Sequence, residues 1–533
     1  MRLTLKAVRT SGLLFAVILS GFFHTERLAG QENTVASVYE RLLRVEINAK
    51  SDDETYRLIP CGEKGVILFY KSLEIVEQEK VRWYFSFYDK DLQLLWTKSI
   101  GLLNSLEYKK YSCDTDTVSL VFRTGEKAKD AELNFEIIRL ALDKGVFMGN
   151  GGKLPESAEV ADFITSGSMA LIGFNVKNEP ARLMIMNLQT GNQHITPLSA
   201  GAVSTLIQLD IDSSGSRIIA STRKIPAKNQ PTFVLSVFDF AGNLLSETII
   251  SPVTPEHEIN AMRFLQINPG EIIVAGTYGS PPVQKGSSRN LLPGESTGIF
   301  FTKVIDNQQQ SIIFYNFLEL KNANQLVGEK NLQAIKKKSE KKNKNLNEYS
   351  IDLTLLLHPL TIKNNNEIIL LAESFFPQYH SENFTDYDFY GRPFTNSYSV
   401  FDGYRYSNAL IAGFDRTGKL AWDNSIEIRN LVSFELNSKV IQYNQGNNFM
   451  MAYLSEGKIA SKIIHHDEVI EKLDFSQIEL QYPNDKLLAE TKSRMVSWYG
   501  NFFLCYGYQE IKNVALERNN KRLVFYFNKI RFD

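Results

Sequence analysis

The chain of 533 residues has little of several features that define whole classes of protein. After residue 30 it contains no apolar run long enough to form a transmembrane helix. Its 59 Lys and Arg residues nearly balance its 60 Asp and Glu residues, which argues against nucleic acid as the main partner. These two features disfavour an integral helical membrane protein and a nucleic-acid-binding protein.

Cysteine is scarce as well, with only Cys61, Cys113 and Cys505 in the chain. An odd number leaves at least one thiol outside any disulfide formed within the chain. Cys61 and Cys113 occupy similar places in two neighbouring repeats, so a disulfide between them is one hypothesis. The other, which we favour, is that the cysteines serve as small apolar residues in strands.

Sequence signatures of catalysis are missing. The histidines after residue 30 show no HExxH or related metal-ligand spacing, and there is no G-x-S-x-G nucleophile elbow and no phosphate-binding loop. The adjacent His465 and His466 would point in opposite directions in an extended chain, so we interpret them as part of a surface turn. We therefore expect a protein that is not an enzyme and needs no cofactor, with calcium left open.

Two acidic groups are candidates for calcium. Asp210 and Asp212 with Gly215 resemble the start of a calcium loop, but Ser221 stands where a Glu is required, so a hairpin turn is the better interpretation. Asp386, Asp388 and Asp402 are better candidates, since carboxylates in a loop suit a hard cation. The default interpretation of these three is solvated turn residues.

What the chain does have is a hairpin that recurs along its length. A strand rich in Phe, Tyr, Ile and Val leads into a tight turn of the Asp-x-x-Gly type, and the second strand opens on apolar residues. Asp suits the first corner because its carboxylate binds nearby backbone N–H groups, and Gly suits the later corner because it tolerates positive φ. The clearest copies place this corner at Asp89, Asp239, Asp306 and Asp415, and residues 182–195 form a longer variant with Asn187 and Gly191.

A second type of hairpin precedes each of these, so each unit is predicted to contain four antiparallel strands. There are about eight copies, recurring after roughly fifty residues, which is the period of propellers and related arrays. Sheets that are apolar on both faces bury them by radial stacking. The copies lie at residues 58–71, 112–124, 163–175, 209–221, 266–278, 361–374, 442–455 and 497–509.

The predicted fold is all-β, a β-propeller of four-stranded blades, with eight blades favoured and seven as the alternative. The last unit has one clear strand after its first hairpin, within residues 521–533, and lacks an outermost strand. Residues 39–48 precede the first unit and can supply this strand. We therefore predict that an N-terminal strand closes the ring.

The hairpins resemble known propeller repeats. Residues 212–221, DSSGSRIIAS, are similar to the strand-turn-strand of WD40 and YVTN-type blades, while FDRTGKLAW and NLQTGN resemble the turn of PQQ-type repeats. The Trp-Asp dipeptide of WD40 blades and the full PQQ signature are not in place. The Asp-x-x-Gly turns also lack the flanking Ser and Thr-Trp of a sialidase Asp box. The resemblance therefore implies a fold and no ligand or activity.

The first thirty residues predict export. Basic Arg2, Lys6 and Arg9 precede the apolar stretch 11–23, and a polar segment ends at Gly30, which is the three-part layout of a secretory signal peptide. No Cys lies near the expected cleavage point, so a lipoprotein is disfavoured. We expect residues 31–533 to form a single propeller domain in the periplasm or outside the cell. The many Lys, Asn, Ile, Phe and Tyr residues resemble exported proteins of Bacteroidota.

Two insertions interrupt the predicted repeats between Asp306 and Asp415. The first, at about residues 321–350, is rich in lysine, and its composition predicts a solvated helix or a disordered loop. An anionic surface is the alternative role for these lysines. They are Lys336, Lys337, Lys338, Lys341, Lys342 and Lys344.

The second insertion, residues 375–406, is predicted to be a long aromatic loop between the second and third strands of one blade. Tyr and Phe among Ser, Asn and Gly are typical of recognition surfaces, because rigid rings give contact area at a low cost in entropy. The alternative is a cap that folds back and buries its own rings. The predicted binding residues are Phe376, Tyr379, Phe384, Tyr387, Phe389, Tyr390, Phe394, Tyr398 and Tyr404.

Together these features favour a non-catalytic exported propeller that acts as an interaction or accessory subunit of an outer-membrane complex, such as a secretion translocon or a nutrient importer. The expected partner is an outer-membrane or periplasmic protein. Glycan binding is the first alternative, because aromatic faces stack on sugar rings. A glycoside hydrolase with carboxylates from different blades is the second.

Overall fold

The structure is a computed structural model that describes residues 43–51, 55–125, 134–199, 201–224, 231–280, 294–322, 325–326, 328–342, 351–363, 366–515 and 521–532. The predicted signal peptide lies outside these residues. No helix within the described ranges is long and apolar enough to cross a membrane. The described strands form eight antiparallel sheets, six of which have four strands, and the all-β propeller fold is confirmed.

The chain divides into two compact units. One contains the described residues up to Tyr70, Phe85–Thr97 and those from Ser476 onward, and the other contains Lys71–Tyr84 and Lys98–Phe475. The strands of one four-stranded sheet follow the order β2-β3-β4-β5. They are β2 (Arg57–Pro60), β3 (Val66–Glu77), β4 (Lys80–Tyr88) and β5 (Leu94–Leu103), with the short helix η1 (Gly62–Lys64) before β3.

The first unit contains a sheet that joins the two ends of the described chain. Its strand order is β1-β36-β35-β34, with β1 (Arg44–Asn48), β34 (Asp485–Tyr499), β35 (Phe502–Asn513) and β36 (Lys521–Arg531). β1 pairs antiparallel with β36 from Arg44↔Asn528 to Asn48↔Val524. The prediction that an N-terminal strand supplies the outermost strand of the last sheet is confirmed. The predicted residues 39–42 lie outside the described part of the chain.

Three four-stranded sheets follow one another at the start of the second unit, each ordered as in the sequence. The first contains β6 (Leu106–Cys113), β7 (Thr117–Thr124), β8 (Phe135–Ala141) and β9 (Val146–Gly152). The second contains β10 (Ala158–Ser166), β11 (Met169–Val176), β12 (Arg182–Asn187) and β13 (Gln193–Pro197). The third contains β14 (Ser204–Ile211), β15 (Ile218–Lys224), β16 (Thr232–Phe238) and β17 (Leu244–Ile250).

The remaining sheets of this unit carry additions. A five-stranded sheet contains β18 (Glu258–Asn268), β19 (Glu271–Gly279), β21 (Gly298–Ile305), β22 (Gln308–Gln309) and β23 (Ile313–Asn316). A seven-stranded sheet contains β20 (Glu295–Ser296), β24 (Leu353–Leu357), β25 (Thr361–Ile362), β26 (Ile368–Tyr387), β27 (Pro393–Phe414), β28 (Leu420–Glu427) and β29 (Val432–Ser433). The last contains β30 (Ile441–Gln445), β31 (Asn448–Ser455), β32 (Lys458–His465) and β33 (Glu468–Gln477).

The core of the second unit lies between successive sheets. Phe135 and Ile137 of β8 pack in one cluster with Phe174 of β11 and Met184 of β12, and all four are buried. The inner strands of these sheets are apolar on both faces, because each face meets a neighbouring sheet. The pattern that predicted stacked sheets is thus the pattern that forms the core.

The predicted turn chemistry is present in most of the repeats. The Asp239 carboxylate accepts hydrogen bonds from the backbone N–H groups of Ala241 (2.9 Å) and Asn243 (2.8 Å), and Gly242 has φ 85°. Asp415 and Gly418 repeat this arrangement. The alignment of Asp306 with these corners is wrong. Asp306 and Asn307 are themselves the two positive-φ residues of a tight turn between Ile305 and Gln308.

The lysine-rich insertion forms the helix α2 (Glu329–Lys342), which follows the short helix η2 (Phe317–Glu319). Leu332 is buried in the same cluster as Phe317, and Ile335 packs against it. The expectation of a fully solvated segment is therefore wrong for one face of α2. The lysines at 336, 337, 338 and 341 are exposed on the rest of the helix.

A candidate binding site on a projecting aromatic ribbon

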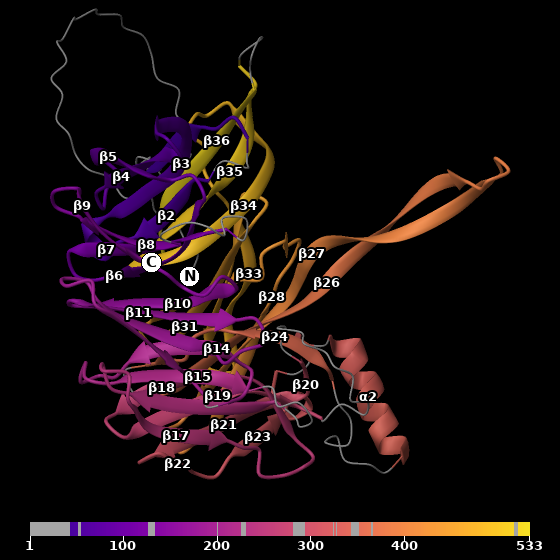
Figure 1. The fold of residues 1–533 in the computed structure, drawn as a ribbon. Coiled ribbons are helices and arrows are strands. Elements are labelled where there is room, and N and C mark those ends of the chain that lie inside the picture. The colour runs from indigo at the N-terminus through magenta and orange to yellow at the C-terminus, as the bar shows by residue number, and fades with distance from the viewer. Residues whose placement is uncertain are drawn as a thin grey trace, which may run out of the picture. The chain divides into compact units, whose positions relative to one another are not determined.

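The aromatic insertion is not a loop. β26 and β27 continue beyond their sheet as a two-stranded antiparallel ribbon, paired from Phe376↔Arg405 to Tyr387↔Pro393. Figure 1 shows the two orange strands extending far from the sheet that carries them. We call residues 376–405 the aromatic ribbon. Its place between the second and third principal strands of the sheet is as predicted, whereas its conformation is not.

The tip of the aromatic ribbon explains why it folds as a hairpin. The Asp388 carboxylate accepts hydrogen bonds from the N–H groups of Tyr390 (2.9 Å) and Arg392 (2.8 Å), and Gly391 has φ 73°. This is the Asp-x-x-Gly turn of the repeats. Residues 388–391, Asp-Phe-Tyr-Gly, were the signal that could have identified the hairpin from the sequence.

The base of the aromatic ribbon is fixed in the core. Phe375 and Tyr406 face each other across the ladder and are 2% and 1% exposed. The Tyr406 hydroxyl donates to the Asn437 carbonyl oxygen at 2.7 Å, and β29 pairs with Tyr404 and Arg405. The neighbouring carboxylate of Glu373 is fully buried and accepts hydrogen bonds from the backbone N–H groups at 439 and 440. The ribbon therefore leaves the sheet from a rigid base.

The two faces of the aromatic ribbon differ, because side chains alternate along a strand and directly paired residues share a face. One face beyond Tyr379 is lined by short polar side chains, and we call it the hydroxyl face. It contains Ser381, Asn383, Thr385, Thr395, Ser397 and Ser399. The opposite face, which we call the acidic face, contains His380, Glu382, Phe384, Asp386, Phe394, Asn396, Tyr398 and Val400.

Most of the predicted binding residues are exposed on this ribbon. Phe384, Phe394 and Tyr398 lie on the acidic face, Tyr387 ends the hydroxyl face, and Phe389 and Tyr390 form the tip. Their exposure ranges from 44% at Phe394 to 97% at Phe389. Phe376 and Tyr379 are also exposed, whereas Tyr404 is half-buried near the base. The interpretation of the insertion as a cap that buries its own rings is therefore wrong.

Aromatic rings also connect the base to the outer part of the ribbon. Phe375 contacts Tyr404 edge-on at 5.7 Å between ring centroids, and Tyr404 contacts Phe401 at 5.2 Å. Phe401 in turn lies 5.5 Å from Tyr379, on the same face. On the acidic face the rings of Phe384 and Tyr398 lie 5.7 Å apart. Such pairs hold the rings in fixed positions, which reduces the entropy that a partner must remove on binding.

A histidine connects the charged groups of the acidic face. His380 Nδ1 lies 2.5 Å from the Asp402 carboxylate, and Nε2 lies 3.3 Å from Glu382. Glu382 also accepts a hydrogen bond from the Tyr398 hydroxyl. Hydrogen bonds to Asp402 and then to Glu382 raise the pKa of His380 above its ordinary value. Hydrogen bonds from Tyr398 and His380 lower the pKa of Glu382.

The calcium candidates do not converge. Asp388 is engaged in the turn, Asp386 accepts a hydrogen bond from the N–H of Tyr387, and Asp402 lies at a bulge nearer the base, beside His380. Asp212 accepts hydrogen bonds from the N–H groups at 216 and 217, as a hairpin residue does. Within the described residues no group of three acidic, His or Cys side chains is arranged to hold a metal ion.

The structure also shows where the two adjacent histidines and the three cysteines lie. His465 ends β32 and His466 lies in the following turn with φ 55°, as predicted. The structure carries all three cysteines as thiols, so the hypothesis of a Cys61–Cys113 disulfide is wrong. Cys505 is buried in β35, and burial raises the pKa of its thiol well above the ordinary value. Cys61 is half-buried and Cys113 is exposed, so the favoured interpretation as buried apolar residues holds for Cys505 and is wrong for the other two.

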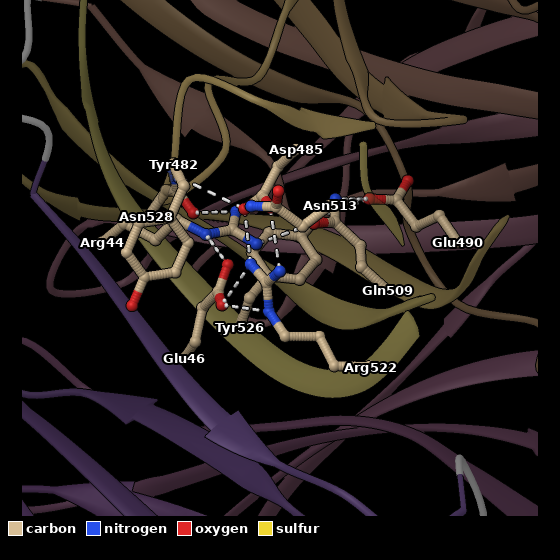
Figure 2. A network of polar contacts seen from close by, with 10 residues as sticks. All are labelled: Arg44, Glu46, Tyr482, Asp485, Glu490, Gln509, Asn513, Arg522, Tyr526 and Asn528. Carbon is tan, nitrogen blue, oxygen red and sulfur yellow. Dashed lines mark hydrogen bonds and ion pairs between the residues drawn. The ribbon is translucent and has the colours of Figure 1, made fainter. Parts of the chain in front are cut away.

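A second polar cluster lies in the first unit (Figure 2) and was missed by sequence analysis. Arg522 binds the carboxylates of Asp485 at 2.5 Å and Glu46 at 2.9 Å. Arg44 donates hydrogen bonds to Glu46 (2.8 Å), Asn528 (2.9 Å) and Gln509 (2.8 Å). Its members come from β1, β34, β35 and β36, so the network connects every strand of that sheet.

This network is built for stability. Burial acts to raise the pKa of Asp485, but the hydrogen bond and charge of Arg522 overcome this effect and lower the pKa below its ordinary value. Burial raises the pKa of Tyr526 well above its ordinary value, and its hydroxyl donates to Glu490 at 2.6 Å. A carboxylate held by arginine in this way stays ionised and is poorly suited to general acid–base work.

The comparisons with known proteins add no argument to what the structure shows. No family model and no curated protein matches the chain. Solved structures that are similar include the β-propeller domain of the Trilobed protease from Pyrococcus furiosus, at 8% identity and a TM-score of 0.34 over 80% of this chain and 98% of that one. The polysaccharide lyase Uly1 matches at 9% identity and a TM-score of 0.37, over 81% of this chain and 90% of that one. Likenesses this distant carry no argument about activity, ligand or partner.

Proposed function

We propose that this chain is a non-catalytic exported β-propeller that acts as an interaction subunit of an outer-membrane complex, with the aromatic ribbon as its principal contact surface. A secretion translocon or a nutrient importer is the kind of complex that fits a periplasmic subunit of this design. The observation that carries the proposal is the exposure of the rings of Phe384, Tyr387, Phe389 and Tyr390 on an element that projects from the sheet.

Large exposed apolar groups that gather on one element mark interaction sites in soluble proteins. Tyr and Phe are suited to such a contact because each buries much area with two side-chain torsions. The buried base at Phe375 and Tyr406 supports the same function, since it lets the ribbon present its rings without disturbing the sheet. A partner that closes over the tip would remove the most exposed ring, Phe389, from water.

Glycan binding is the second candidate. It is favoured by the acidic face, where the rings of Phe384 and Tyr398 lie beside Asn396 and the carboxylate of Glu382. Aromatic faces stack on sugar rings, and amides and carboxylates bind hydroxyl groups. The ribbon contains no Trp, the most common platform for sugars in such sites.

The test is affinity purification of the tagged protein from gently solubilised native envelopes, compared with a variant in which residues 376–404 are replaced by an Asn-Gly turn. We expect a stoichiometric envelope protein with the native chain and its loss with the variant. The thermal midpoint of the variant should change little, because the buried residues Phe375 and Tyr406 remain.

The control is a variant that removes three lysines of the other insertion, Lys336, Lys337 and Lys341, which are exposed on α2. It should retain the partner. Recovery of a lone monomer with the native chain would contradict the proposal and turn attention to polysaccharide binding. Binding of polysaccharide that is lost in the variant without residues 376–404 would then support the second candidate.

A further inference from the structure

The outer edge of β26 in the aromatic ribbon meets no strand among the described residues. β24 pairs with β26 at positions 372–374, and β25 pairs at positions 368 and 369. From Phe376 to Tyr387, β26 pairs with β27 alone among the described strands. At about 3.3 Å per residue this edge is roughly 40 Å long. An unpaired edge of this length is a template for another strand.

The register identifies which backbone groups point outward. The Asp388 N–H donates to the Arg392 carbonyl oxygen at 3.0 Å, so these residues form a hydrogen-bonded pair. Hydrogen-bonded and non-bonded pairs alternate along an antiparallel ladder. Tyr387 and the alternate residues before it therefore direct their N–H and C=O groups away from β27. They are Tyr379, Ser381, Asn383, Thr385 and Tyr387.

The two edges of the ribbon are not equivalent. The edge of β27 is partly occupied near the base, where β29 pairs with Tyr404 and Arg405 and the ring of Phe434 lies 6.2 Å from that of Phe401. Near the tip it carries Pro393, which has no N–H group to donate. β26 has its own proline, Pro377, near the base, but its edge keeps every donor from Tyr379 to Tyr387.

Charge adds a second distinction. Between Phe376 and Gly391 there is no Lys or Arg, whereas Glu382 and Asp386 both lie on the acidic face of β26. The positive groups of the ribbon already have partners. His380 lies between Asp402 and Glu382, and Arg392 lies 3.9 Å from the Asp388 carboxylate. Arg405 donates to Gln378 near the base. A second copy of β26 would bring more carboxylates to this face. A strand with positive side chains at alternate positions would instead lie opposite Glu382 and Asp386.

We propose that the edge of β26 from Tyr379 to Tyr387 accepts an extended strand of the partner protein that carries Lys or Arg at alternate positions. This inference rests on the proposed function, because it assigns the way in which the ribbon holds its partner. Backbone hydrogen bonds to the added strand supply affinity, and the paired charges fix its register. The rings of the tip remain free for further contacts.

A matched pair of proline variants tests the edge. Asn383 and Ser397 are directly opposite each other in the ribbon, on the edges of β26 and β27. By the register, neither N–H group belongs to the ladder between the two strands. Asn383→Pro removes a donor from the proposed edge, and Ser397→Pro removes one from the other edge. Both variants should keep the ribbon, since proline is tolerated where the N–H group points to solvent.

The probe is a labelled ten-residue peptide with Lys at every second position and Val or Thr between, added to the purified full chain. We expect protection of the 379–387 amides from hydrogen exchange and binding that falls about tenfold in Asn383→Pro, the loss of about one hydrogen bond. Ser397→Pro should bind within about twofold of the native chain by the same reasoning. The same peptide with Glu in place of Lys should not bind.

Three results would overturn the inference: equal losses in both proline variants, binding of the Lys peptide without protection of the 379–387 amides, and no binding of that peptide at all. A fourth such result would come from sedimentation velocity, which measures whether the chain forms a dimer. A dimer that Asn383→Pro abolishes would make a second copy the occupant of this edge. The envelope purification described above is independent of the peptide. If it depends on residues 376–404 while the peptide fails, only the strand-addition inference falls.

Discussion

One strand of this protein lies in two environments, and the comparison explains why its outer half was hard to interpret. In Ile368–Ser374 every residue of β26 is buried, because sheets pack on both faces. From Phe376 onward the residues of the same strand are almost all exposed. The strand continues without a break in pairing partner, yet its side chains change from aliphatic to aromatic and polar. The backbone of β26 thus stays extended and paired along its whole length, while the burial of its side chains changes at Phe376.

The sharpest test of this comparison uses neighbouring phenylalanines. Phe375 is 2% exposed and packs in the core, while Phe376 points to the opposite face and is 48% exposed. Phe375→Ala should lower the free energy of unfolding by about 3–5 kcal/mol, because it leaves a cavity. Phe376→Ala should cost about 0.5 kcal/mol or less. Chemical denaturation of both variants measures the difference, and similar losses would show that the boundary lies elsewhere.

Buried and exposed charges provide the next comparison. Arg522→Ala leaves the buried Asp485 carboxylate without its ion pair, and such a loss typically costs about 3 kcal/mol or more. Arg392→Ala removes an exposed arginine near the ribbon tip and should change stability by about 0.5 kcal/mol or less. Unfolding by urea at neutral pH checks both values. Equal stability of the two variants would contradict the role assigned to the network in Figure 2.

The same turn occurs in the sheet and at the ribbon tip, so a glycine variant can compare them. At Gly418 an added Cβ would lie 2.4 Å from the Phe301 ring, whereas at Gly391 it would meet nothing within 4 Å. Both have positive φ, which costs about 1–2 kcal/mol for other residues. Gly418→Ala should therefore lower the thermal midpoint, while Gly391→Ala should only increase hydrogen exchange near the tip. A drop in midpoint for Gly391→Ala would mean that the ribbon contributes to global stability.

The smallest expected effect concerns His380. Its pKa lies above the ordinary value because of Asp402 first and Glu382 second, so the positive charge of His380 is lost as pH rises through that raised pKa. Asp402→Asn should lower the pKa of His380 more than Glu382→Gln does. NMR titration of the imidazole measures both shifts. A larger effect from Glu382→Gln would contradict the geometry at the bulge.

The repeats were predictable from sequence because the turn of each hairpin is specified by residues within that hairpin. Asp239 with Gly242 and Asp415 with Gly418 fix the corners through local hydrogen bonds, which require no knowledge of distant residues. The pairing of residues 44–48 with the last strand was predictable for a related reason, since a four-stranded unit lacked one strand.

The rest depends on contacts that sequence spacing does not reveal. The network of Arg44, Asp485 and Arg522 unites residues more than four hundred positions apart, as the bond from Arg44 to Asn528 shows. The aromatic composition of residues 375–406 predicts a recognition loop, because Tyr and Phe among Ser, Asn and Gly are typical of such loops. The alternation of Ser381, Asn383 and Thr385 with larger side chains, and the Asp388-to-Gly391 turn, carried the opposite information.

The pairing of β1 with β36 also has a consequence for the order in which the chain folds. In β36, Val524, Phe525 and Phe527 are buried in the finished sheet, where β1 covers the edge of that strand. Until Arg44–Asn48 docks, that strand is an apolar edge able to recruit another nascent chain. These two strands must find each other although 484 positions separate Arg44 from Asn528, which makes this step slow. A variant that lacks residues 44–48 should therefore aggregate during refolding, even though its other sheets retain all their strands.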